Sequence, residues 1–208
     1  MRAGSALLAL DTATQHASVA LVARSDGRVL AETSARPISL VAGIQRLLDE
    51  AELGADAIGA LVAGTGPGSY TSLRIGLATA RSLAFSLGVP VAGVSTLQAL
   101  AAGAPGARPL IDARRGEVFA LAPDPVCLRP GDMGSSEGEV YVGNGAIRYR
   151  ETLEAQGAVV PPADDVRHRV NAALHVTLAS EFGDASALMP AYLRVPDAER
   201  TRKEFPVG

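Results

Sequence analysis

The order of elements in this 208-residue chain predicts an α/β protein of two lobes, each built on a mixed sheet with covering helices. Three apolar strands come first, and helices then alternate with strands, which is typical of a sheet that combines antiparallel and parallel pairs. The pattern of the first two strands returns about a hundred residues later, as a duplicated core would require. With 48% hydrophobic and 20% charged residues, the chain can form a packed core.

The first half of the chain has the clearest periodicity. Short apolar runs predict its strands, and apolar residues that recur every three or four positions predict its helices. Gly54 and Gly88 follow the two predicted helices as stop signals. The predicted elements are, in order, strands at 6–10, 19–23 and 29–33, a helix at 40–51, a strand at 60–63, a helix at about 72–87 and a strand at 90–94.

An internal repeat links the two halves. The strand that ends at Asp11 is followed by a polar turn and a second strand, and the strand that ends at Asp112 is followed by the turn 113–116 and the strand 117–121. Two lobes with duplicated cores would produce this pattern, and so would two unrelated hairpins. The order within each lobe resembles the ribonuclease H-like lobes of actin, sugar kinases and heat-shock ATPases (the ASKHA group), with the second lobe reduced.

The second half is less regular. We expect an N-terminal lobe at 1–104 and a smaller C-terminal lobe at 105–208, with a hinge in the Ala-, Gly- and Pro-rich segment 102–108. The elements predicted after the hinge and the repeated hairpin are a loop at 123–137, a strand at 139–143, helices at 147–156 and 171–182, and an exposed charged tail after Pro196.

Charge and residue content argue against several classes of protein. The net charge is −3 and lysines and arginines form no long run, so the chain is not expected to grip nucleic acid by itself. Cys127 is the only cysteine, which excludes an intrachain disulfide. His168 and His175 stand about two helical turns apart, too far for one metal ion. No catalytic constellation or metal site is predicted.

No targeting or membrane signal is recognised in the sequence. The apolar run near the N-terminus is short and ends at Asp11, and no stretch approaches the roughly 20 apolar residues of a membrane span. We expect a soluble, cytoplasmic protein.

A glycine-rich loop at 64–68 joins a predicted strand to a predicted helix. Its amides and the helix N-terminus could face a phosphate, although an ordinary strand-to-helix turn has the same glycines. The loop matches neither the Walker A nor the G-x-G-x-x-G pattern. Asp11 and Asp112 could likewise face a metal–phosphate or cap their own turns. The candidate phosphate-facing residues are Asp11, Thr12, Gly66, Gly68 and Ser69.

The helix predicted at 72–87 has an apolar seam. Its residues recur at alternating intervals of four and three positions, as in a coiled coil. Small residues at its centre would let another helix approach closely, so the seam packs either on the core of this chain or on a partner. The candidate interface residues, two of them from the preceding helix, are Ile44, Leu47, Leu73, Arg74, Leu77, Ala80, Arg81 and Ala84.

Five stretches, in chain order, resemble the TsaB (YeaZ) family. The most specific is 64–76, GTGPGSYTSLRIG, which is similar to the family signature GPGSFTGLRIG. The family's HSE segment at the start of the first helix is absent, and Ser72 stands where the family has glycine. The other four stretches are 8–14 (family LaiDTS), 94–97 (GVSSLeaLA), 111–118 (iDARRgEVY) and 190–194 (P.YLR).

The resemblance implies a function that the residues alone do not. It implies a non-catalytic subunit of the bacterial machinery that forms N6-threonylcarbamoyladenosine at position 37 of tRNAs reading codons that begin with A. The implied partners are a TsaD-type catalytic subunit, a TsaE-type ATPase and, when the chain is alone, a second copy in a homodimer. The tRNA is met mainly through the complex, no cofactor is bound by this chain alone, and ATP or ADP is bound only within the complex.

Two other functions remain as alternatives. An ASKHA-type nucleotide-dependent phosphotransferase would need an acid or base near the phosphates and an adenosine pocket, for which only Gly143-Asn144-Gly145 offers a candidate. A metallopeptidase would need clustered metal ligands, which the sequence does not show.

Overall fold

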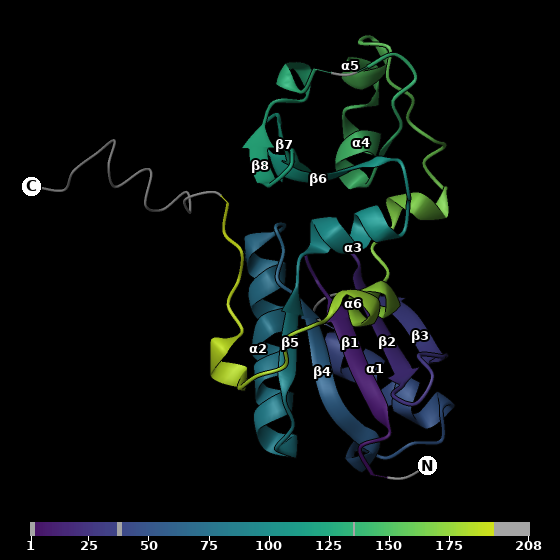
Figure 1. Ribbon diagram of the computed structural model, residues 1–208, viewed down its shortest axis with the longest axis vertical. Helices are drawn as coiled ribbons and strands as arrows, with labels where there is room; N and C mark the ends of the chain where they lie inside the picture. Colours follow the sequence, from purple (N-terminus) through teal and green to yellow (C-terminus); the bar gives the residue numbers. More distant parts are fainter. Residues whose placement is uncertain (1–2, 37–38, 135, 194–208) are drawn as a thin grey trace, which may run out of the picture.

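The computed structural model describes residues 3–36, 39–134 and 136–193, and it shows two sheets that lie one above the other along the long axis (Figure 1). The first sheet contains β1 (Ala6–Asp11), β2 (Ala17–Ala23), β3 (Val29–Ala35), β4 (Ile58–Gly64) and β5 (Val91–Val94). Its order is β3-β2-β1-β4-β5, with β2 antiparallel to both neighbours and the β1–β4 and β4–β5 pairs parallel. This is the predicted mixed sheet of a ribonuclease H-like lobe.

Helices cover both faces of the first sheet. On one face α1 (Leu40–Glu50) and α2 (Tyr70–Leu87) share a core with apolar side chains of β1, β2 and β4. On the other face lies α6 (Ala172–Leu178), which comes from the far end of the chain. The left-handed backbone of Gly88, with φ of 65°, ends α2. No helix in the described part of the chain has the length and apolarity to cross a membrane.

The second sheet repeats the arrangement of the first on a smaller scale. It contains β6 (Arg108–Arg114), β7 (Glu117–Leu121), β8 (Pro125–Leu128) and β9 (Tyr141–Val142) in the order β8-β7-β6-β9. As with β3-β2-β1-β4, the first two pairs are antiparallel and the last is parallel. A single parallel bridge between Val140 and Val159 stands beside β9, where the first sheet has a fifth strand. This shared order supports the duplicated core and the reduced second lobe.

Several predicted elements of the second half differ from the structure. Strand β8 lies inside the predicted loop 123–137, because it pairs with β7 along its whole length. The predicted strand 139–143 is reduced to β9. The predicted helix 147–156 is two short helices, α4 (Asn144–Arg148) and α5 (Arg150–Glu154), which the non-helical backbone of Tyr149 separates. The tail predicted after Pro196 lies outside the described residues.

The chain returns to the first lobe after the second sheet. Helix α6 packs on β1 and β2, and it ends at Leu178 rather than 182 because Ala179 is extended, with ψ of 121°. Further on, Leu188 is buried in the core that α1 and α2 share. The division at 104/105 places this segment in the second lobe, whereas its contacts are with the first sheet and α2. The lobes are therefore not two consecutive halves of the chain.

A buried hydrogen-bonded contact between two polar side chains anchors α6 to the end of β1. Nε2 of His175 lies 2.9 Å from Oδ2 of Asp11, and both side chains are at most 1% exposed. The same oxygen accepts a 2.6 Å hydrogen bond from Thr96, and Oδ1 accepts one of 2.8 Å from the Ala13 amide. Burial raises the pKa of Asp11, but these hydrogen bonds and the attraction of His175 outweigh it, so the pKa lies below its ordinary value of 3.8.

The Asp11–His175 pair makes a pH-dependent prediction. Because the folded-state pKa of Asp11 is lowered, the stability it contributes is present above its unfolded pKa of about 3.8 and is lost as the pH falls through the folded value. Replacing His175 by Leu leaves the buried Asp11 carboxylate without this partner, so the free energy of unfolding at pH 7 should fall by about 3–5 kcal/mol. Urea unfolding at pH 3 to 7 measures this.

The pH dependence supplies the control. The difference in the free energy of unfolding between His175→Leu and the unchanged protein should narrow below about pH 4, because a protonated Asp11 depends less on this partner. Exposed His16, changed to Leu, should leave stability within about 0.5 kcal/mol. A difference in the free energy of unfolding that stays constant from pH 3 to 7 would contradict the pairing of Asp11 with His175.

Close packing of α2 against β1 makes a second prediction. A Cβ atom on Gly76 would lie 2.1 Å from Oγ1 of Thr12, which is buried and donates a 2.7 Å hydrogen bond to the Ser72 carbonyl. Gly76→Ala should therefore destabilise the protein by about 1–3 kcal/mol, despite the better helix propensity of alanine. Ser82→Ala, at an exposed position of the same helix, is the control, and equal thermal midpoints for the two variants would rule out the clash.

Candidate functional site

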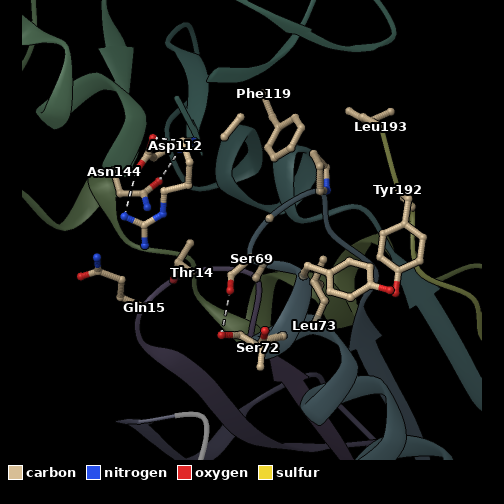
Figure 2. Close-up of a pocket in the computed structure, with 18 of the residues that line it drawn as sticks. Thr14, Gln15, Ser69, Ser72, Leu73, Asp112, Phe119, Asn144, Tyr192 and Leu193 are labelled. Carbon is tan, nitrogen blue, oxygen red and sulfur yellow. Dashed lines mark hydrogen bonds and ion pairs between the residues drawn. The ribbon is translucent and has the colours of Figure 1, made fainter. Parts of the chain in front are cut away.

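A cleft of about 530 Å³ lies between the lobes (Figure 2). Its floor is the β1–β2 turn and the first turn of α2, and its roof is the β6–β7 turn with Asn144. Polar side chains such as Asp112, Asn144 and Gln15 occupy one side, while Phe119 and Tyr192 form an apolar and aromatic wall on the other (Figure 2). The cleft can therefore hold a ligand with both polar and apolar parts.

The glycine-rich loop is held by backbone contacts. Gly66 has a φ of 93°; its amide lies 3.2 Å from Oγ1 of Thr96, and its carbonyl accepts a 2.8 Å bond from the Thr96 amide. A Cβ on Gly68 would lie 2.2 Å from the Ala13 carbonyl, which accepts the Ser69 amide at 2.8 Å. These glycines therefore allow the loop to pack against the turn after β1 and the start of α3 (Thr96–Ala102).

Only part of the predicted phosphate-facing set lines the cleft. Gly68 and Ser69 do so, whereas Asp11, Thr12 and Gly66 do not. The carboxylate of Asp11 is taken up by Thr96, His175 and the Ala13 amide. The hydroxyl of Thr12 is directed at α2 by its bond to the Ser72 carbonyl. The prediction that these three residues face a phosphate is wrong, because internal hydrogen bonds use their polar groups.

The two repeat aspartates act as turn caps, one of the two interpretations open from the sequence. Oδ1 of Asp112 accepts the Arg114 amide at 2.9 Å, as Oδ1 of Asp11 accepts the amide two residues on. Asp112 also lies 3.7 Å from Nε of Arg148. Its turn is unusual, since Arg114 and Arg115 both have left-handed φ angles of 64° and 55°.

The apolar seam of α2 belongs to the core of this chain. Its side chains are at most 5% exposed. Most of them pack on the first sheet, as do the two candidates from α1, whereas Leu73 lies beside Gly66 at the cleft. The prediction that they contact a partner is therefore wrong, because other segments of this chain already cover them. The candidates buried in this way are Ile44, Leu47, Leu73, Leu77, Ala80 and Ala84, whereas Arg74 and Arg81 are exposed.

The opposite side of α2 faces solvent. We call the exposed residues Arg74, Ala78, Arg81, Ser82 and Phe85 the α2 outer face. Phe85 is 87% exposed, more than any other large hydrophobic side chain in the described ranges. Ala78 and Ser82 are small, and the helix contains no acidic residue. Such a surface is suited to packing against another helix that carries acidic side chains.

One contact at the mouth of the cleft could not be expected from local sequence. Nε of Arg74 donates a 3.1 Å hydrogen bond to the hydroxyl of Tyr192, 118 residues away. The guanidinium also lies over the ring of Tyr70, 4.1 Å from its centre, and the two tyrosine rings stack at 5.0 Å. The resemblance of residues 190–194 to a family motif was the only sign in the sequence that this segment is important. Local sequence likewise gave no sign that His175 would contact Asp11.

Comparisons with known proteins all find similarity to TsaB or TsaD proteins. The family of TsaD, tRNA N6-adenosine threonylcarbamoyltransferase, matches residues 32–129. The TsaB protein of Escherichia coli K12 is 41% identical over 123 residues, covering 54% of this chain and 52% of that protein. TsaB of Bacillus subtilis 168 is 34% identical over 122 residues, with coverage of 54% and 52%. The matched region thus spans about half the length of these curated relatives.

Solved structures extend the similarity over most of the chain. YeaZ from Pseudomonas aeruginosa has a TM-score of 0.74 and 30% identity, covering 91% of this chain and 100% of that one. A protein described as similar to the peptidase YeaZ from Pseudomonas aeruginosa gives a TM-score of 0.75 at the same identity and coverage. Within the described residues no group of three potential metal ligands occurs. By its fold and its sequence, the chain belongs to the TsaB (YeaZ) family.

Proposed function

We propose that this chain is the non-catalytic subunit that binds and supports a TsaD-type enzyme in forming N6-threonylcarbamoyladenosine at position 37 of tRNA. Its TsaB relatives are described as tRNA threonylcarbamoyladenosine biosynthesis proteins, and the TsaD family matches part of its length. A TsaE-type ATPase joins the complex of this chain with the TsaD-type enzyme. ATP or ADP is bound only within that complex, and tRNA is contacted mainly by the complex rather than by this chain alone. Alone in the cytoplasm, the chain forms a homodimer.

The observation that carries this proposal is the α2 outer face. The inner side of α2 is buried in its own lobe, so the outer side is the part of the helix that remains for a partner. Ala78 and Ser82 would let a partner helix approach to about 8–10 Å between axes. Phe85 would then enter a pocket of the partner, since large aromatic side chains at the centre of an interface contribute most to affinity.

The environment of Asp11 supports a role other than phosphoryl transfer. In that alternative, an aspartate at the end of the first strand faces the metal and the phosphates. Here its carboxylate is buried and hydrogen-bonded to Thr96 and His175. Recruiting it to a metal ion would break the contact that holds α6 to the first sheet.

A charge in place of Phe85, the largest apolar side chain of the α2 outer face, should weaken partner binding. Phe85→Glu buries a carboxylate in the proposed interface, so the affinity for the TsaD-type subunit of the same organism should fall about 30-fold or more. Calorimetric titration gives the dissociation constant, and reconstituted tRNA modification should fall in parallel.

The matched control is Val166→Glu, which changes another exposed apolar side chain, 74% exposed, in the second lobe. It should leave affinity within about twofold. Normal binding by a folded Phe85→Glu protein would show that the interface lies elsewhere. If the unchanged chain formed no complex and modification proceeded without it, the proposed function itself would fail.

The phosphotransferase alternative has a direct assay. The purified chain should not hydrolyse ATP above the background of an Asp11→Asn variant, because Asp11 is committed to internal contacts. Turnover that depends on Asp11 would favour the phosphotransferase.

A further inference from the structure

The segment 188–193, here called the C-terminal strap, joins the two lobes across the mouth of the cleft. Leu188 is buried in the core of the first lobe. The amide of Ala191 donates a 2.8 Å hydrogen bond to the carbonyl of Thr65. Leu193 packs against the cluster that contains Phe119 of the second lobe. Because the last three residues of the strap also line the cleft, its position affects how open the cleft is.

One residue of the α2 outer face holds this strap. Arg74 donates from Nε to the hydroxyl of Tyr192 at 3.1 Å, and its guanidinium lies over the ring of Tyr70. Figure 2 shows Tyr192 on the side of the cleft where Leu193 also lies. The same guanidinium is exposed to solvent, so it can meet a partner without any rearrangement of α2.

The charges on α2 indicate which partner group would compete for Arg74. Arg74 and Arg81 are two helical turns apart on the same exposed face, and the helix has no acidic residue to neutralise them. A carboxylate binds a guanidinium through two parallel hydrogen bonds, which are about twice as strong as bonds to a neutral hydroxyl. When the carboxylate approaches along the Nε edge, it takes the hydrogen that Tyr192 now accepts.

Resting on the function proposed above, we propose that Arg74 relays partner binding to the cleft: an acidic side chain of the partner helix pairs with Arg74, releases Tyr192 and loosens the strap. The TsaD-type subunit would thus open the mouth of the cleft as it docks. The coupling is reciprocal, so a change that breaks the Arg74–Tyr192 hydrogen bond in advance and leaves Arg74 in place should favour docking.

Tyr192→Phe tests the relay, because it removes the hydroxyl and keeps the ring that stacks on Tyr70. Arg74 then no longer donates a hydrogen bond to residue 192. The affinity for the TsaD-type subunit should therefore rise about 2- to 10-fold, the range expected for one neutral hydrogen bond. In the unchanged protein, hydrogen exchange of the backbone amides of Met189 and of residues 191–193 should speed up when the partner is added. The matched control, Tyr149→Phe, removes a hydroxyl near Asp112 and should not change affinity.

The outcomes separate the relay from the proposed function. Tighter binding by Tyr192→Phe together with faster strap exchange supports the relay. Equal or weaker binding, or strap exchange that slows or stays constant, overturns the relay and leaves the proposed function standing, provided that the complex forms and Phe85→Glu weakens it. If the unchanged chain forms no complex, both proposals fail.

Discussion

The carboxylate of Asp11 is the constraint on which most of this structure depends. It is buried at the end of β1 and must be satisfied by neighbours, because an unpaired charge in the interior is costly. Thr96, at the start of α3, and His175, in α6, form hydrogen bonds with it. One side chain thus joins the first sheet to the element that leads into the second lobe and to the helix that returns from it.

The position of α6 has consequences further along the chain. With α6 anchored to the first sheet, the residues that follow run back along α2, where Leu188 is buried and Tyr192 meets Arg74. The cleft therefore has a wall that neither lobe supplies alone. A helix that covers one sheet and a strap that reaches the other explain how the lobes stay together across the cleft.

The duplicated lobes use their equivalent aspartates differently. Both cap a turn, but Asp11 is buried beneath α6, whereas Asp112 lies beside the cleft and near Arg148. In the second lobe the aspartate instead contacts Arg148 and Tyr149, and the sheet has four strands rather than five. The cleft is therefore asymmetric, with its arginines on the second lobe and a helix N-terminus on the first.

Local sequence predicted a large part of the fold. The strands β1 and β2 and the helices α1 and α2 follow from periodicity, because burial of one face imposes a repeat on neighbouring residues. The repeat of strand, aspartate and turn predicted the second sheet. The elements after 122 were predicted poorly, since short strands and broken helices leave little periodic signal.

The candidate sites show what local sequence could not predict. A seam with helical spacing is apolar whether it meets its own sheet or a partner, so sequence could not distinguish the two, and burial assigned it to the core. Asp11 and His175 are 164 residues apart, and Arg74 and Tyr192 are 118 apart. The sequence by itself determined most elements of the first half of the chain, the repeat and the family. Only the tertiary structure decided which faces stay exposed and which polar groups are already paired, because those depend on contacts between segments far apart in the chain.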